Sequence, residues 1–84
     1  MPFFVYLLEC QDRSLYCGWS NDWQKRLAAH QAGKASKYTR ARLPVRLVYV
    51  EEVKSRSIAL SRECEIKRFS ARKKRLLIRE KTRV

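Results

Sequence analysis

The chain has 84 residues, with 20 lysines and arginines against 8 aspartates and glutamates, which gives a net charge of +12 at pH 7. This length holds one small domain and excludes two, and the hydrophobic fraction of 45% excludes a wholly disordered chain. So large a positive charge on a small domain predicts a polyanionic partner, usually nucleic acid. A basic surface that only adds solubility is the alternative.

The apolar residues give no sign of a membrane or export segment. No stretch approaches the roughly 20 apolar residues of a membrane span. The N-terminal MPFFVYLLEC has neither a basic start nor a cleavage site, so it predicts a strand and a cytoplasmic protein. Cys10, Cys17 and Cys64 match no disulfide framework and complete no zinc site with the single histidine. We expect reduced, packed thiols.

Two apolar runs near the N-terminus predict a β-hairpin. Residues 3–10 and 15–19 are rich in aromatic and β-branched side chains, and the Gln-Asp-Arg-Ser between them is typical of a turn. If the loop holds an odd number of residues, two tyrosines, Tyr6 and Tyr16, fall on one face of the hairpin.

A first helix is predicted after the hairpin. Asn21 is the expected N-cap, with Asp22 in the first turn, and Gly33 ends the helix. Three apolar residues of this helix are expected to pack inward: Trp23, Leu27 and Ala28. Arg26 and His30 are four residues apart, so their side chains lie side by side on one face.

The middle of the chain predicts a connection and a strand. Residues 34–44 are basic and contain one aromatic side chain, Tyr38, so we expect an irregular connection. Residues 46–50 are apolar at nearly every position, which predicts a third strand that is well covered by other elements.

Two further helices complete the predicted domain. Ser55 or Ser57 caps the first of them and Ser70 caps the second. The expected apolar anchors of the last helix are Leu76, Leu77 and Ile78. The order ββαβαα predicts one α/β (α+β) domain with a small, mainly antiparallel three-stranded sheet flanked by helices. Its core is expected at about residues 3–78, followed by a charged, frayed tail at 79–84.

Glu63 is a carboxylate predicted to lie among apolar residues. On a helical wheel it falls between Ala59 and Leu60, on the side that should face the sheet. A carboxylate there needs a cation or a metal ion to balance it. Lys67, four residues further on, is the ordinary partner, and metal ligation by Glu63 is the functional alternative.

Several other side chains have both an ordinary and a functional interpretation. The guanidinium of Arg26 is suited to clamp a phosphate, or it is simply solvated on the helix surface. His30 has the chemistry of a general base or a metal ligand, although most helix-face histidines are neither. Tyr6, Tyr16 and Tyr38 are ordinary core or surface aromatics unless they share a site.

Five stretches form a pattern that is specific only in combination: VYLLEC, SLYCG, NDWQKRLAAH, GKASKYTRARLPVRLVYVEE and ALSRECEIKRFS. In order and spacing they resemble the GIY-YIG nuclease superfamily, which supplies the catalytic domain of homing endonucleases, of an excision-repair nuclease subunit and of structure-specific resolving nucleases. The resemblance is greatest to its short stand-alone members, the YhbQ-like group, and covers about residues 3–78. Two departures are Phe4, where the first motif has glycine, and Cys17, where the second has isoleucine.

The resemblance implies six catalytic residues: Tyr6, Tyr16, Arg26, His30, Tyr38 and Glu63. Glu63 is the implied ligand of one divalent ion, Mg²⁺ or Mn²⁺, with Glu65 as the alternative ligand. Arg26 would neutralise the phosphate oxygens. Tyr16 would take the proton of the attacking water, with His30 as its helper base.

The same pattern and the positive charge predict nine positions at the nucleic-acid backbone: Gly18, Lys34, Lys37, Arg40, Arg42, Arg46, Lys67, Arg72 and Lys73. Gly18 is expected to let a phosphate backbone approach the sheet. For the basic run 72–75 a solvated helix face is an equal alternative.

These features together predict a metal-dependent endonuclease that hydrolyses phosphodiester bonds, with DNA favoured over RNA and a role in repair or recombination. The alternatives are a binding module that does not cut or needs a partner to cut, and a structural ribonucleoprotein component. We expect a monomer or weak dimer. A protein partner is one way to supply specificity, because 84 residues leave no room for a second, DNA-reading domain.

Overall fold

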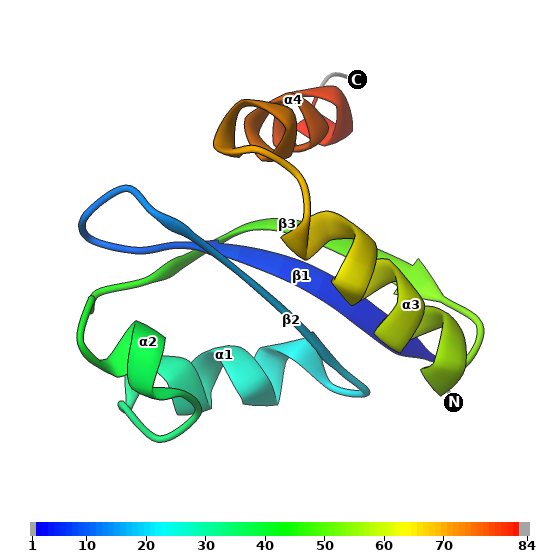
Figure 1. Cartoon of the computed structure of the whole chain (residues 1–84). Coiled ribbons are helices and arrows are strands. Elements are labelled where there is room, and N and C mark those ends of the chain that lie inside the picture. The colour runs from blue at the N-terminus through cyan, green and yellow to red at the C-terminus, as the bar shows by residue number, and fades with distance from the viewer. Residues whose placement is uncertain (1, 83–84) are drawn as a thin grey trace.

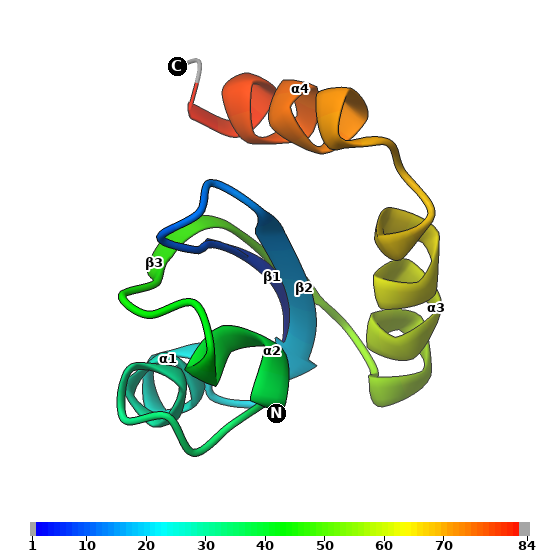
Figure 2. The same cartoon turned by 60° about the vertical axis from the view of Figure 1, so that its left-hand side comes forward.

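The computed structural model describes residues 2–82. The elements in chain order are β1 (Phe3–Glu9), β2 (Leu15–Ser20), α1 (Trp23–Gln31), α2 (Lys37–Arg40), β3 (Arg46–Val53), α3 (Arg56–Lys67) and α4 (Ala71–Thr82). The strands form one antiparallel sheet in the order β2-β1-β3. The helices α1 and α2 lie on one side of this sheet and α3 and α4 on the other (Figures 1 and 2). The predicted α+β fold with a three-stranded antiparallel sheet is confirmed.

The register of the hairpin brings Tyr6 and Tyr16 onto one face of the sheet. Tyr6 pairs with Gly18 and Leu8 pairs with Tyr16, across a loop of five residues, 10–14. Because side chains alternate along a strand, Tyr6 and Tyr16 point to the same side of the sheet. Cys17 points to the other side, so the predicted placement of these residues is confirmed.

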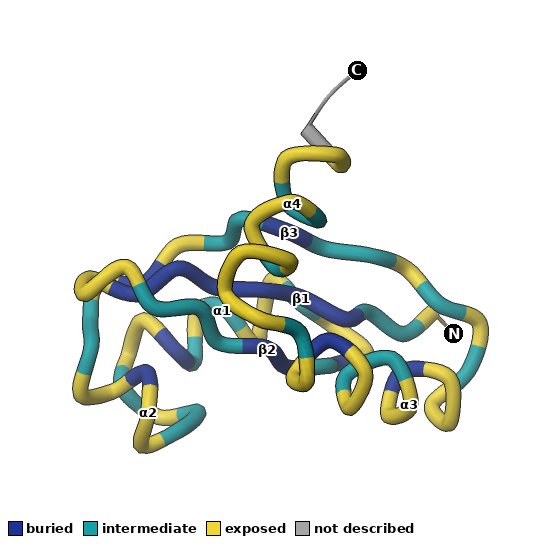
Figure 3. Tube along the Cα trace, turned by 45° about the horizontal axis from the view of Figure 1, so that its top comes forward, coloured by how far each residue is buried: buried dark blue, intermediate teal, exposed yellow. Residues whose placement is uncertain are grey.

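The sheet carries a separate apolar cluster on each face. Toward α3 and α4 the buried members are Val5, Leu7, Cys17, Tyr49, Ala59 and Ile66. Toward α1 they are Tyr6, Leu8, Cys10 and Val45. β1 is the central strand and is buried over most of its length (Figure 3), so side chains that leave β1 reach both sides of the molecule.

The first helix begins one residue later than predicted. The N-cap is Asp22, whose carboxylate accepts a hydrogen bond from the backbone N–H of Lys25 at 3.1 Å. The Ser20 hydroxyl accepts a hydrogen bond from the backbone N–H of Asp22 and holds the cap in place. The prediction of Asn21 as the cap was therefore wrong, whereas the end at Gly33, whose φ is +75°, agrees with the structure.

Four of the six predicted helix anchors pack against the sheet: Trp23, Leu27, Leu77 and Ile78. Ala28 is exposed and the Leu76 side chain is 45% exposed, so these two predictions were wrong. In α1 the sheet-facing position is taken by the buried His30, which turns Ala28 outward. In α4, Leu76 lies about 100° around the helix from Leu77 and faces solvent.

The segment 34–44 contains a helical turn that the sequence analysis missed. Ser36 caps α2 by accepting a hydrogen bond from the backbone N–H of Thr39 at 3.1 Å. β3 then runs to Val53, longer than predicted, and only Tyr49 in it is fully buried. The prediction that this strand is well covered was wrong, because β3 lies at an edge of the sheet.

The last two helices begin where the serines predicted. The Ser55 hydroxyl accepts from the N–H of Ile58, and the Ser70 hydroxyl accepts from the N–H of Lys73. α4 continues through Thr82, beyond the expected start of the tail, and residues 83–84 lie outside the described part of the chain. Among residues 2–82, no helix has the length and apolar character needed to cross a bilayer.

Candidate active site

The phenol of Tyr6 lies across β2 at Gly18. A Cβ atom on Gly18 would be 2.5 Å from the Tyr6 hydroxyl and 2.7 Å from its Cζ. Any side chain at this position would displace the Tyr6 ring. Gly18 therefore makes room for Tyr6, which is a different reason for glycine from the phosphate approach that the sequence predicted.

A chain of hydrogen bonds runs inward from this phenol. The Tyr6 hydroxyl is 3.0 Å from His30 Nε2, and His30 Nδ1 is 2.8 Å from Thr39 Oγ1. Thr39 Oγ1 is in turn 3.0 Å from the Ser36 hydroxyl. Tyr6, His30 and Thr39 are all buried. These hydrogen bonds thus link β1 to α1 and α2, and they engage both ring nitrogens of His30.

These contacts change the expected role of His30. The imidazole bonds to Tyr6 and Thr39, whereas Tyr16 meets only its ring edge, with centroids 5.2 Å apart. Burial lowers the pKa of His30, and the charge of Arg26 lowers it further. A neutral, fully engaged imidazole fixes the position of Tyr6, so His30 is a positioning residue for Tyr6.

The lowered pKa of His30 predicts a pH dependence of folding stability. The unfolded chain takes up the proton first as the pH falls, because the folded-state pKa lies below the ordinary value of 6.5. The free energy of unfolding is therefore expected to be highest above about pH 6.5 and to decline as the pH falls from there to the folded-state pKa. Urea denaturation at pH 7.5, 6.5 and 5.5 measures this decline.

The matched variant is His30→Asn, which cannot titrate and should show a flatter profile over the same pH range. Glu9 and Asp12 also have pKa values displaced by their partners, but downward from 4.5 and 3.8, so their effects fall at lower pH. A wild-type decline that persists unchanged in His30→Asn would contradict the assignment to His30.

Tyr16 and Tyr38 form a stack beside the imidazole. Their ring centroids are 5.9 Å apart, and the guanidinium carbon of Arg42 lies 3.8 Å from the centroid of the Tyr38 ring. Arg42 Nε also donates to Asp12 Oδ2 at 3.0 Å. The structure therefore brings Tyr38 to the predicted site through its contact with Tyr16, and it holds Tyr16 between Tyr38 and His30 while leaving it partly exposed.

Charges of both signs lie within electrostatic range of Tyr6. Burial is the main cause that raises the pKa of its phenol, and Tyr16 and Glu63 act in the same direction, while Arg26 opposes them. Arg26 is exposed and lines a surface pocket at the start of α1 together with Lys25. The phenol of Tyr16 and the charges of Arg26 and Glu63 thus act on Tyr6 from three other elements, β2, α1 and α3.

Glu63 reaches this region from α3, on the opposite side of the sheet. Its side chain is 17% exposed, and Lys67 Nζ lies 3.6 Å from its carboxylate. Burial and then the charge of Glu63 raise the pKa of the Cys17 thiol to about 12. The expected burial of Glu63 and its pairing with Lys67 both agree with the structure.

The alternative carboxylate, Glu65, is placed differently. Its side chain is 58% exposed, and its carboxylate accepts from Arg62 Nη1 at 2.7 Å. Arg62 also donates to Glu51 on β3 at 2.9 Å, so Glu65 belongs to the network that fastens α3 to β3. Glu63 is the less exposed of the two carboxylates, and its charge acts on Tyr6.

The donor set around Glu63 decides what kind of metal ion it suits. Within residues 2–82, no three His, Cys, Asp or Glu side chains gather where they would enclose a metal ion. A closed structural or zinc-type site is therefore not built here. One carboxylate does suit Mg²⁺ or Mn²⁺, which keep several waters and bind through one or two carboxylates and substrate phosphates.

The predicted backbone-contacting residues divide into two groups. Lys34, Lys37 and Arg40 line one surface pocket around α2, near the Tyr38 stack. Arg42 lies on the Tyr38 ring itself and Gly18 lies against Tyr6, whereas the other four lie apart from this pocket. Arg46 pairs with Glu9, Lys67 pairs with Glu63, and Lys73 lies over the ring of Phe69 at 4.2 Å. Arg72 is exposed on α4.

Sequence reasoning missed two polar residues that build the site, Ser36 and Thr39. The signal was present as a serine followed three residues later by threonine, in the order expected for a helix N-cap. This cap signal was overlooked because a helix of four residues is too short to show the apolar periodicity by which helices are predicted. The bond between Thr39 and His30 depends on tertiary packing and has no local signal.

A model of the GIY-YIG catalytic domain matches residues 2–76. The chain belongs to the GIY-YIG family. A UPF0213 protein of Haloquadratum walsbyi is 49% identical over 79 residues, which cover 94% of this chain and 89% of that protein. A UPF0213 protein of Streptococcus sanguinis is 51% identical, with 94% and 91% covered. The solution structure of the UPF0213 protein BH0048 from Bacillus halodurans has a TM-score of 0.63 and 43% identity, with 96% and 86% covered.

These relatives place the chain in the stand-alone GIY-YIG group, within a superfamily of nucleases. The two departures from the GIY-YIG motifs leave the site geometry intact. Phe4 pairs in regular register with Ser20 of β2, two positions along the strand from the pair of Tyr6 with Gly18. Cys17 packs into the opposite cluster, so its replacement of isoleucine affects packing only.

Proposed function

We propose that this protein is a metal-dependent endonuclease that hydrolyses phosphodiester bonds, with DNA as the preferred substrate. The observation that carries the proposal is the arrangement around Tyr6: the phenols of Tyr6 and Tyr16 both contact His30, and the charges of Arg26 and Glu63 both act on the phenol of Tyr6. This arrangement combines a cation for a phosphate, a carboxylate for a metal ion and a phenol for a proton. A role in repair or recombination is what membership of the superfamily adds.

The environments of the two tyrosines assign them different roles. Tyr6 is buried and bonded to His30, and its pKa is raised, so its phenol stays neutral and serves as a fixed support. Tyr16 is partly exposed and held between two rings. Tyr16 is therefore the phenol that would lose its own proton to solvent and, as the phenolate, accept a proton from an attacking water.

Arg26 and Glu63 supply the charges. The exposed guanidinium of Arg26 presents N–H donors in the planar geometry that matches phosphate oxygens. Glu63 would hold the divalent ion with its one carboxylate, which lies 3.6 Å from Lys67 Nζ. When bound, such an ion supplies Lewis-acid stabilisation of phosphate and leaving-group oxygens.

A binding module that does not cut is the second candidate. The pairing of Glu63 with Lys67 favours it, because a carboxylate already paired with a lysine competes less well for a metal ion. This alternative predicts binding of nucleic acid without strand breaks, with or without divalent ions.

The deciding experiment is cleavage of end-labelled single-stranded, duplex and branched DNA and of RNA, each in Mg²⁺, Mn²⁺ or EDTA. We expect cutting of DNA in Mg²⁺ or Mn²⁺ and none in EDTA. A parallel preparation of Glu63→Gln controls for contaminating nucleases, since such an activity would survive the substitution. Binding without cutting in every condition would replace the endonuclease by the binding module.

A further inference from the structure

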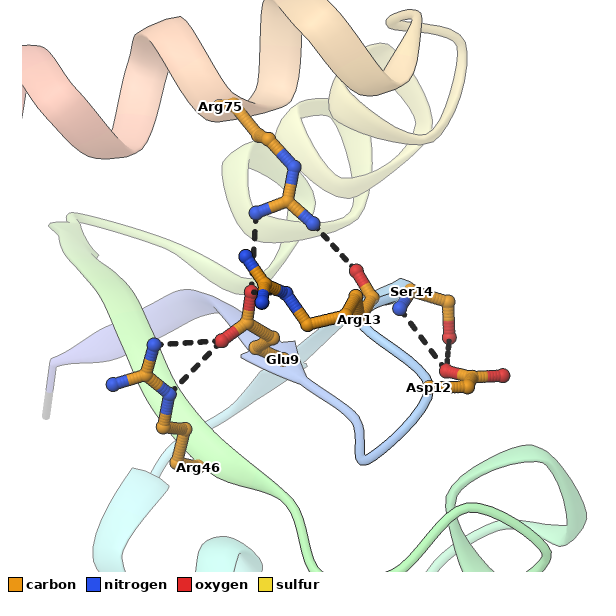
Figure 4. Close-up of polar contacts among 6 residues, drawn as sticks. All are labelled: Glu9, Asp12, Arg13, Ser14, Arg46 and Arg75. Carbon is orange, nitrogen blue, oxygen red and sulfur yellow. Dashed lines mark hydrogen bonds and ion pairs between the residues drawn. The ribbon is translucent and has the colours of Figure 1, made fainter.

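A second charged cluster lies away from Tyr6, around the carboxylate of Glu9 (Figure 4). Arg46 donates to Glu9 Oε1 from Nε at 3.0 Å and from Nη2 at 2.6 Å. Arg75 Nη1 donates to Glu9 Oε2 at 3.1 Å, and Arg13 Nε lies 3.8 Å from the same oxygen. The three arginines come from the hairpin loop, β3 and α4.

The cluster contains more positive charge than Glu9 can balance. One carboxylate faces three guanidinium groups, which leaves two positive charges without an anion. The carboxylate is buried, with its side chain 10% exposed, whereas the Arg13 and Arg46 side chains are 82% and 75% exposed. Each guanidinium has five N–H donors, so most of the donors of Arg13 and Arg46 face solvent.

The backbone holds Arg13 in a fixed position. Its φ of +73° is in the left-handed region, which is uncommon for a residue other than glycine. The turn is closed by the hydrogen bond from Arg13 N–H to the Cys10 carbonyl at 2.9 Å, and by Asp12, which accepts from the N–H and hydroxyl of Ser14. Arg75 also donates to the Arg13 carbonyl. The loop conformation thus places the Arg13 side chain beside Glu9.

The cluster is separate from the site at Tyr6. Glu9 follows the alternation of β1 toward α4, which supplies Arg75, whereas Tyr6 and Leu8 face α1. A surface pocket borders the cluster, lined by Glu9, Arg13 and Arg46 with other residues of the hairpin loop and of the segment just before β3. An anion in this pocket would meet two guanidinium groups that Glu9 has already oriented.

We propose that Arg13, Arg46 and Arg75 form a phosphate-binding subsite that holds the nucleic-acid backbone outside the catalytic site. The proposal rests on the proposed function in that the ligand is the same nucleic acid. Guanidinium groups bind phosphate bidentately, and arginines already held together by Glu9 lose little conformational entropy on binding. Glu9 is thus the positioning residue of the subsite.

The test is the salt dependence of DNA binding, measured in EDTA so that no cleavage interferes. The variant is Arg13→Asn, because asparagine tolerates a positive φ and the substitution removes the guanidinium group. We expect the slope of log Kd against log salt for a short single-stranded DNA to fall by about one unit, and for Arg13→Asn/Arg46→Gln by about two. Thermal denaturation monitors the fold of each variant.

The matched control is Lys54→Ala, which removes an exposed charge at the opposite end of β3 from Arg46. Its slope should change less than that of Arg13→Asn. Equal changes in both variants, or none in Arg13→Asn, would overturn the subsite. So would a dependence on Arg13 seen with anionic lipid vesicles and absent with DNA.

The two proposals fail in different ways. Wild-type protein that cuts DNA while Arg13→Asn binds with an unchanged salt slope would remove the subsite and leave the endonuclease. Wild-type protein that never cuts but loses salt-dependent binding in Arg13→Asn would remove the endonuclease and leave the subsite.

Discussion

Replacing Glu63 with glutamine is expected to reduce the rate of DNA cleavage by about 10²- to 10³-fold, the usual cost of losing one electrostatic contact to the transition state. Glutamine keeps the size of the side chain and removes the negative charge. The fold should survive, because the pair that Glu63 makes with Lys67 is 3.6 Å long and Lys67 is half exposed, and such pairs contribute about 0–1 kcal/mol. Cleavage rates and urea denaturation are the two measurements.

Glu65→Gln is the control for this prediction. It makes the same chemical change two residues further along α3, on a carboxylate that is 58% exposed and paired with Arg62. We expect wild-type cleavage from it. If Glu63 holds the divalent ion, the residual activity of Glu63→Gln should also require a higher concentration of Mg²⁺. Equal losses in both variants would assign the effect to the helix and not to the site.

Much of this arrangement followed from local patterns in the sequence. The alternation of the hairpin placed Tyr6 and Tyr16 on one face, and helical periodicity placed Glu63 toward the sheet and Glu65 away from it. Both patterns depend on the period of one element. The helix caps at Ser55 and Ser70 were likewise predicted from local sequence, because a cap bonds to a backbone N–H only three residues away.

The features that were missed depend on contacts between elements. His30 was expected to assist Tyr16, yet its ring nitrogens bond to Tyr6 and Thr39. The spacing of Arg26 and His30 predicts that they share one face of α1. It does not predict that His30 is buried while Arg26 is exposed. The ion pairs of Glu9 with Arg46 and Arg75 could not be predicted from the sequence either. They join residues far apart in the chain and form only when β3 and α4 pack against β1.

Introducing a methyl group at Gly18 is expected to damage the site more than any conservative change on its surface. In Gly18→Ala the new Cβ would lie 2.5 Å from the Tyr6 hydroxyl, well inside van der Waals contact. The Tyr6 ring is rigid, buried and bonded to His30, so it cannot move aside without breaking that bond. We expect a loss of about 1–3 kcal/mol in the free energy of unfolding, as for other overpacked cores, and loss of nearly all cleavage activity.

A double-mutant cycle with Tyr6→Leu separates this clash from a general effect on β2. Leucine lacks the hydroxyl and the Cζ atom that the new methyl group would meet, so Gly18→Ala should cost little stability in the Tyr6→Leu background. The expected coupling between the two positions is about 0.5–3 kcal/mol, the range found for residues in contact. Additive effects would mean that alanine disturbs the strand itself. A strong coupling, with the His30 ring signals displaced in the NMR spectrum of Gly18→Ala alone, would establish that glycine is needed here to hold the phenol of Tyr6 against its histidine.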